Sequence, residues 1–139
     1  STPVNSNIFS GKNKAIIVTL PSKPGQETAN RSALSSKTNI IEVKENRGQV
    51  NLKDMLKKLA RLEITSVLVE GGGTLIGSLF DEKLVDKVLF FISPKIIGGK
   101  QSISSVMGAG VTRVEKAMKL KSVRFRRIGE DFLIEGDVA

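Results

Sequence analysis

The amino-acid sequence predicts an α/β domain: a mostly parallel central sheet flanked by helices, with an antiparallel hairpin at the C-terminus. Three observations support this fold class. Apolar, β-branched runs alternate with amphipathic stretches along much of the chain. Two strand-like runs separated by a Gly-Glu-Asp turn close the sequence. The 139 residues, 40% hydrophobic and 26% charged, suffice for a single domain with its own core.

The individual elements follow from local residue patterns. Runs rich in Val and Ile, bounded by Pro, Gly or polar residues, predict strands, and apolar residues three or four apart predict helices. Segments rich in Gly, Asn or Pro between them predict loops. The predicted strands are residues 14–20, 39–43, 64–70, 84–92, 119–128 and 131–138; the predicted helices are residues 27–35, 51–62 and 74–82; the predicted loops include residues 44–50 and 93–102.

The helix predicted over residues 51–62 has the clearest signal. Asn51 is a natural N-cap, because its side chain can accept a hydrogen bond from a free N–H of the first turn. Five apolar residues at helical spacing form a stripe expected to face the core, and lysines and an arginine cover the opposite face. The stripe consists of Leu52, Met55, Leu56, Leu59 and Leu62.

The composition excludes several kinds of chemistry. The chain contains no cysteine and no histidine, which rules out disulfides, thiol nucleophiles, serine–histidine triads and histidine-ligated metals within it. Acid–base catalysis therefore falls to Asp, Glu or Lys, and no metal is expected. No apolar run is long enough to span a bilayer, so no membrane partner is expected. The absence of cysteine fits a cytoplasmic location.

The formal charge of +8 suggests an anionic partner, either a nucleic acid or a small molecule. The basic residues are scattered along the chain, with one local cluster at Arg124–Arg127. Only Phe125 is interleaved with that cluster, so a stacking platform for bases is poorly supported. The sequence does not favour nucleic-acid binding.

Three consecutive glycines, Gly71, Gly72 and Gly73, stand between the predicted strand 64–70 and the next helix. A helix N-terminus presents free N–H groups and a partial positive charge, and glycine leaves no Cβ to block an anion. A tight turn is the alternative explanation, but it needs only one glycine, and three cost conformational entropy with no evident structural return. The turn therefore predicts a phosphate site, with Thr74 ready to donate a hydroxyl.

Neither familiar phosphate-binding motif matches this turn. The Rossmann fingerprint fails because Ile76 occupies the position of its third glycine, and no acidic residue follows at the required distance. The Walker A motif fails because Ser78 and Leu79 stand where Lys and Ser or Thr are required. Gly77 costs its helix about 1 kcal/mol relative to alanine, which a closely packed element or a bound cofactor would explain.

The stretch Ser66–Gly99, "SVLVEGGGTLIGSLFDEKLVDKVLFFISPKIIGG", resembles the reductase domain of the bifunctional riboflavin-biosynthesis deaminase/reductase family. The opening "TPVNSNIF" with "KAIIVT" and the closing hairpin are similar to that family too, so the resemblance covers nearly the whole chain. It implies a dihydrofolate-reductase-like fold, a homodimer, and NADPH-dependent reduction of the ribosyl group of a phosphoribosylamino-pyrimidine to a ribityl chain.

The resemblance also implies roles for individual residues. Glu70 would be the catalytic, substrate-contacting carboxylate, with a helix-dipole or capping role as the alternative. Thr19 would touch the adenosine half of NADPH. Lys23 or Arg31 could meet its 2′-phosphate, although a surface charge is the simpler interpretation. The other cofactor-binding residues would be Gly71, Gly72, Gly73, Thr74, Leu75, Ile76, Gly77 and Ser78.

The chain also departs from the family pattern. It lacks the residue types of the zinc deaminase signature, and the family's reductase domain begins before the position of Ser1, so residues 1–139 are expected to form one reductase-type domain without its N-terminal segment. Whether this segment is active alone stays open. Two alternatives also stay open: another dihydrofolate-reductase-like reductase of a pterin or pyrimidine, and a basic nucleic-acid-binding module.

Overall fold

The structure is a computed structural model that describes residues 3–10, 15–23, 25 and 29–139. The chain divides into two units, Ser1–Val67 and Leu68–Ala139. The first unit contains η1 (Asn7–Phe9), β1 (Ile16–Thr19), α1 (Ala29–Ser35), β2 (Asn39–Glu42), β3 (Glu45–Asn46), β4 (Gln49–Val50) and α2 (Leu52–Ala60). The second contains α3 (Gly73–Asp81), β5 (Lys87–Ile92), η2 (Val114–Lys116), β6 (Leu120–Ile128) and β7 (Asp131–Val138).

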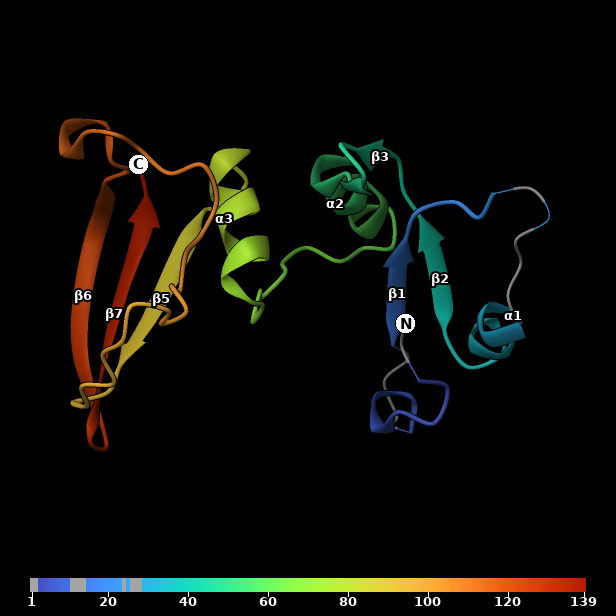
Figure 1. The fold of residues 1–139 in the computed structure, drawn as a ribbon, viewed down its shortest axis with the longest axis horizontal. Coiled ribbons are helices and arrows are strands. Elements are labelled where there is room, and N and C mark those ends of the chain that lie inside the picture. Colours follow the sequence, from blue (N-terminus) through green and yellow to red (C-terminus); the bar gives the residue numbers. More distant parts are fainter. Residues whose placement is uncertain (1–2, 11–14, 24, 26–28) are drawn as a thin grey trace. The chain divides into compact units, whose positions relative to one another are not determined.

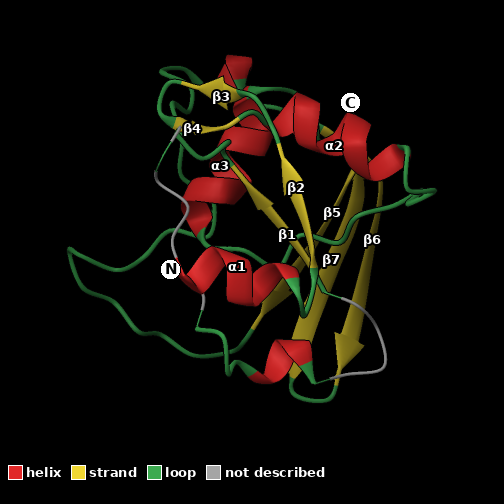
Figure 2. Ribbon diagram, turned by 90° about the vertical axis from the view of Figure 1, so that its right-hand side faces the viewer, coloured by secondary structure: helices red, strands yellow, loops and turns green. Residues whose placement is uncertain are grey.

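Strands β1 and β2 form a parallel pair in the first unit, in register from Ile16 opposite Asn39 to Thr19 opposite Glu42 (Figures 1 and 2). Parallel strands need a crossover connection, and α1 lies within it. Both strands and this helix agree with the sequence predictions. The predicted positions 14, 27 and 28 lie outside the described residues.

Helix α2 begins as predicted. The side chain of Asn51 accepts a hydrogen bond from the Asp54 N–H at 2.9 Å, which satisfies one free donor of the first turn. The helix ends at Ala60, two residues before the predicted boundary, and Glu63 follows with a positive φ of 61°. A left-handed residue at this position is a common helix ending. The predicted apolar stripe is therefore shorter, and Leu62 lies outside the helix, 48% exposed.

Two sequence predictions are wrong in detail. Residues 44–50 were expected to form a loop, but they contain the antiparallel pair β3–β4, joined at Arg47 and Gly48, which both have positive φ. Residues 64–70 were expected to form a strand, but within the described part of the chain they pair with no other strand. Apolar β-branched residues favour an extended backbone, but a strand also requires a partner for its main-chain hydrogen bonds.

The second unit contains an antiparallel sheet in the order β5–β7–β6, with β7 in the centre (Figure 1). The predicted C-terminal hairpin is confirmed as β6 and β7. Leu133 on β7, Val88 on β5 and Leu79 on α3 are buried. Strand β6 lies at an edge of the sheet and is interrupted by an irregularity between Lys121 and Arg124. Of the described helices, the longest have nine residues, too few to cross a bilayer.

Acid is expected to weaken the first unit through Asp54. The Lys44 N–H, which donates to the Asp54 carboxylate at 2.8 Å, lowers the pKa of this carboxyl below its ordinary value of 3.8, and Lys58 contributes by its charge. A carboxyl whose folded pKa is lowered stabilises the fold above the unfolded value and loses that effect as the pH falls through the folded value. We expect the free energy of unfolding to fall below about pH 3.8 and to fall less in Asp54→Asn.

Denaturant titrations at pH 7 and at lower pH measure this difference. Glu63→Gln is the control, because among the described residues the Glu63 side chain has no hydrogen-bonding or ionic partner. Equal acid sensitivity of Asp54→Asn and the unmodified protein would contradict the assigned role of Asp54.

Candidate functional site

The glycine turn lies in the second unit and leads directly into α3. Gly72 is the N-cap, with φ −65° and ψ 159°, an extended conformation that any residue can adopt. Gly71 and Gly73 do not have positive φ values either. The turn therefore needs no glycine for its backbone conformation. The reason for the triplet lies in what surrounds it.

Two glycines of this helix are required by close packing. A Cβ at Gly77 would stand 1.9 Å from the Met107 carbonyl oxygen, and a Cβ at Gly73 would stand 2.4 Å from that of Ser104. Carbon atoms in ordinary contact stay about 3.5–4 Å apart, so the main chain of this loop packs directly on α3. The neighbour of Gly77 is thus a packed element, one of the two predicted explanations. The inference that three glycines bring no structural benefit is wrong at Gly73, because the main chain of the loop leaves no room for a side chain there.

Gly72 differs from its neighbours because it faces open space. Among the described residues, a Cβ at Gly72 would have no other atom within 4 Å, whereas one at Gly71 would meet the Leu75 side chain at 2.9 Å. No contact within this part of the chain therefore explains glycine at position 72. A ligand that approaches the main chain closely would explain it.

The main chain at this open position carries free hydrogen-bond donors. The N–H groups of Leu75 and Ile76 donate to the Gly72 carbonyl oxygen at 3.0 and 3.2 Å. Within the described residues, the N–H groups of Gly72, Gly73 and Thr74 donate to no protein acceptor. Free donors and the positive end of the helix dipole coincide here, which is the arrangement that binds anions. The turn therefore fits a phosphate group.

The remaining predicted residues of α3 differ in their availability to a ligand. The Thr74 hydroxyl donates to Met107 Sδ at 3.6 Å, a weak acceptor that a phosphate oxygen could replace. The Ser78 hydroxyl donates to the Thr74 carbonyl oxygen at 2.9 Å, so its proton is already used within the helix. Leu75 is 41% exposed beside the turn, and Ile76 is half-buried.

Glu70 is exposed and lies two residues before the N-cap of α3. Among the described residues, no side chain caps this helix by a hydrogen bond, so the alternative capping role of Glu70 is not observed. Its other alternative role, a favourable charge near the positive end of the helix dipole, stays open. Within the described part of the chain, its carboxylate forms no ion pair or hydrogen bond and is available to a substrate.

Thr19 belongs to the first unit, where it is the last residue of β1. Its hydroxyl donates to the Leu20 carbonyl oxygen at 3.3 Å, and its register partner at the end of β2 is Glu42. Arg31 forms an ion pair with Glu42, so its charge is already partly used, whereas Lys23 is exposed. Ligands of parallel sheets bind at such carboxyl ends of strands, which fits the predicted adenosine contact.

The sequence analysis missed the loop that packs on α3. Its contacts to the helix come from Ser104, Met107, Gly108 and Ala109, none of which was singled out. A signal was present, because Gly73, Gly77 and Asp81 are four residues apart and therefore share one face of α3. Small residues at this spacing allow another backbone to approach closely.

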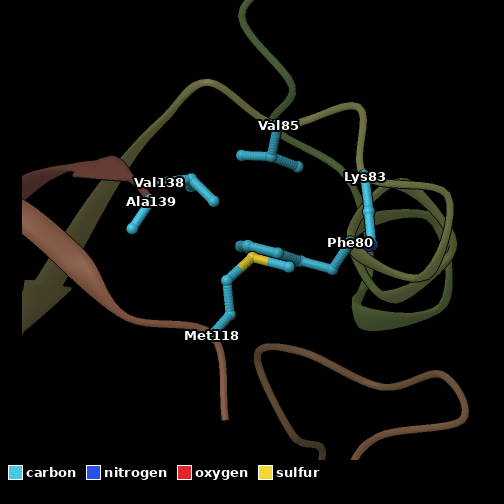
Figure 3. A pocket seen from close by; sticks show the side chains of 6 residues that line it. All are labelled: Phe80, Lys83, Val85, Met118, Val138 and Ala139. Carbon is cyan, nitrogen blue, oxygen red and sulfur yellow. The ribbon is translucent and has the colours of Figure 1, made fainter. Parts of the chain in front are cut away.

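A separate cavity of about 210 Å³ opens near the end of α3 (Figure 3). Its side chains are mainly apolar and include none of the predicted site residues. A volume of this size lies below the roughly 300–1,000 Å³ typical of ligand pockets. It is lined by Phe80, Lys83, Val85, Met118, Val138 and Ala139.

Comparison with known proteins identifies the family. Residues 1–134 match the family model described as the RibD C-terminal domain. The chain belongs to the RibD C-terminal domain family. This RibD C-terminal domain is 36% identical over 96 residues to the riboflavin biosynthesis protein RibD of Actinobacillus pleuropneumoniae, covering 69% of the chain and 26% of that protein.

An archaeal relative covers more of the RibD C-terminal domain. It is the 2,5-diamino-6-ribosylamino-4(3H)-pyrimidinone 5′-phosphate reductase of Methanothermobacter thermautotrophicus, 28% identical over 134 residues, which are 96% of the chain and 60% of that protein. The chain thus spans about a quarter of the RibD relative and three-fifths of the archaeal one.

A solved structure of RibD from Acinetobacter baumannii matches the fold with a TM-score of 0.76 at 18% identity, covering 99% of the chain and 35% of that protein. The fold class is therefore α/β and dihydrofolate-reductase-like, as the resemblance implied. The prediction of a single domain without its N-terminal segment stays a prediction.

Proposed function

We propose that this chain carries out the NADPH-dependent reduction of the ribosyl group of 5-amino-6-(5-phosphoribosylamino)uracil to the ribityl product in riboflavin biosynthesis. The observation that carries the proposal is the open N-cap at Gly72, with free N–H groups, in a chain of the RibD C-terminal domain family. The name of the archaeal relative, a reductase of a phosphorylated ribosylaminopyrimidinone, supports the choice of substrate class.

The cofactor would be held mainly by main-chain donors. The N–H groups of Gly72, Gly73 and Thr74, with the Thr74 hydroxyl, would donate to its phosphates. Thr19 would contact the adenosine half. Gly71, which precedes the N-cap, and the helix residues Leu75, Ile76 and Ser78 would lie beside the rest of the site. Gly77 is covered by the main chain of the loop at Met107 and would not face the cofactor. NADPH, when bound, supplies the hydride for the reduction.

Glu70 would act on the substrate. Its exposed carboxylate precedes the turn and is free to accept hydrogen bonds from ribose hydroxyls. A negative charge at this position also stabilises positive charge that develops on the carbon being reduced. Among the described residues, Glu70 has no ion-pair or hydrogen-bond partner, so the helix dipole is the remaining structural reason for a carboxylate here.

Glu70→Gln is expected to slow the reduction at least about tenfold, because the loss of one charged transition-state contact typically costs more than 1.4 kcal/mol. The affinity for NADPH should change little, because the donors of the turn are main-chain groups. Single-turnover kinetics and cofactor titration measure the two quantities. Glu63→Gln, which removes another exposed carboxylate, is the control. Normal turnover by Glu70→Gln would remove Glu70 from the mechanism.

Titration of the full-length protein with NADPH and with NADH, followed by nicotinamide fluorescence, tests the function. NADPH binding together with turnover of the uracil substrate supports the proposal. Turnover only of another pterin or pyrimidine would favour the alternative reductase. Absence of binding by both cofactors would exclude a nicotinamide-dependent reductase.

We also propose a cytoplasmic homodimer. The second unit exposes large apolar side chains that a second copy could cover, among them Phe91 at 64% and Ile97 at 94% exposure. Sedimentation of the purified protein distinguishes a dimer from a monomer.

A further inference from the structure

The loop residues 104–109 lie along α3 and are fixed at both ends of the helix; we call them the α3 strap. At the first turn, the Met107 N–H donates to the Gly73 carbonyl oxygen at 3.0 Å. At the last turn, the Ala109 N–H donates to the Asp81 carboxylate at 2.8 Å. The strap therefore follows the helix in the same direction, from its N-terminus to its C-terminus.

Where the middle of the α3 strap contacts α3, at Gly108 and Gly77, neither the strap nor the helix has room for a side chain. The Met107 carbonyl group and the Gly108 nitrogen occupy the space that a Cβ at Gly77 would fill. Gly108 itself has a φ of 108°, and a Cβ there would stand 2.6 Å from the Asp81 carboxylate. Glycine is thus required on both sides of the contact, for space and, at Gly108, for conformation.

Asp81 is the anchor of the α3 strap. It is the last residue of α3, where the negative end of the helix dipole disfavours a carboxylate. A negative charge at this end therefore needs a compensating donor, which the Ala109 N–H supplies. Removing the carboxylate should not weaken the helix itself, since an unfavourable charge is removed with it.

The other end of the α3 strap acts on the donors of the glycine turn. The Gly73 carbonyl and the Thr74 N–H belong to the same planar peptide group, so the bond from Met107 also fixes the direction of the Thr74 N–H. The Met107 sulfur accepts a hydrogen bond from the Thr74 hydroxyl. This hydroxyl has a single proton, so it must leave the sulfur before it can donate to a phosphate. Met107 thus orients one group that would meet a phosphate, the Thr74 N–H.

We propose that the α3 strap is a positioning segment for the phosphate-binding turn, with Met107 and Asp81 as positioning residues. This inference rests on the proposed function, and it adds that the turn is ordered before a dinucleotide arrives. Pre-ordered donors bind an anion more tightly, because less conformational freedom is lost on binding.

The test compares Asp81→Ala with Asp81→Asn in the full-length protein. Asn keeps a carbonyl oxygen that can accept the Ala109 N–H, whereas Ala does not. In Asp81→Ala we expect faster hydrogen exchange at the Met107 amide and an NADPH dissociation constant raised roughly tenfold, about the value of one hydrogen bond at the turn. In Asp81→Asn we expect a change within about threefold, since a neutral hydrogen bond remains.

Met107→Leu is the second variant and leaves Asp81 in place. It keeps the side-chain volume and the main-chain bonds but removes the sulfur acceptor. We expect NADPH binding to tighten by at most a few fold, about the value of one weak hydrogen bond, because the Thr74 hydroxyl no longer has to leave a competing acceptor. This difference should disappear in a Thr74→Val background, because no hydroxyl is then left to release. An effect of Met107→Leu on NADPH binding that persists in the Thr74→Val background would instead indicate a structural role of Met107.

The outcomes separate this inference from the proposed function. NADPH binding by the unmodified protein, with equal binding by Asp81→Ala, overturns the positioning role. Unchanged exchange at the Met107 amide in Asp81→Ala overturns the anchoring role, whether or not a cofactor binds. If the unmodified protein binds no NADPH, both the proposed function and the positioning role are wrong. Faster exchange at the Met107 amide in Asp81→Ala would then support only the anchoring contact between Asp81 and the α3 strap.

Discussion

Gly72→Val is expected to abolish NADPH binding and to leave the fold intact. The backbone at Gly72 suits any residue, and a Cβ there would meet no other atom of the described residues within 4 Å. Valine is a poorer N-cap than glycine, which costs at most about 1 kcal/mol. The branched side chain would occupy the space through which a phosphate reaches the free N–H groups. Losing two charged hydrogen bonds, about 3 kcal/mol together, weakens binding roughly 100-fold or more.

Gly72→Ser makes this test sharper because it separates stability from binding. A serine hydroxyl at the N-cap accepts a hydrogen bond from the first turn and should stabilise α3 by a few tenths of a kcal/mol. The same hydroxyl competes with a phosphate for the donor. We therefore expect a slightly raised melting temperature together with a raised NADPH dissociation constant. Unchanged cofactor affinity in both variants would show that the phosphates bind elsewhere.

Gly77→Ala is expected to destabilise the second unit, although alanine is the better helix former. The added methyl group would stand 1.9 Å from the Met107 carbonyl oxygen and 2.2 Å from its carbon. Main-chain atoms cannot rotate away as a side chain can, so the α3 strap must move off the helix. Overpacking costs about 1–3 kcal/mol or more, against a gain of about 1 kcal/mol in helix propensity. We expect a net loss of up to about 2 kcal/mol in urea unfolding.

Gly72→Ala is the matched control, since it makes the same change at the N-cap of the same helix, where the described residues leave free space. It should lower stability by less than about 1 kcal/mol. A Gly77→Ala protein that is more stable than the unmodified one would mean that the α3 strap does not pack on the helix.

The sequence predicted best those elements whose signals are local. Helix α2 carries its own N-cap at Asn51 and its own apolar stripe, and the C-terminal hairpin carries its own turn. The hairpin β3–β4 was missed because its strands are short and polar, and only the positive φ at Arg47 and Gly48 defines it. The strand predicted over residues 64–70 was wrong because strand propensity does not show whether a partner strand is available.

The candidate site was predictable in part for the same reason. The open N-cap at Gly72 follows from glycine chemistry and from the position of the helix start. Gly73 was attributed to a ligand, although the loop main chain at Ser104 already requires it. The α3 strap has no periodicity of its own, so only the four-residue spacing of its contacts on α3 could have revealed it.

Strand β6 has a consequence for the behaviour of the protein at high concentration. One side of this nine-residue strand lies at the edge of its sheet, where unpaired main-chain groups could recruit a neighbouring molecule into a growing fibre. Lys121, Arg124 and Arg126 line the strand, and Ser122, with a φ of 51°, distorts it. Electrostatic repulsion between these side chains and the broken regularity of the strand together oppose runaway polymerisation.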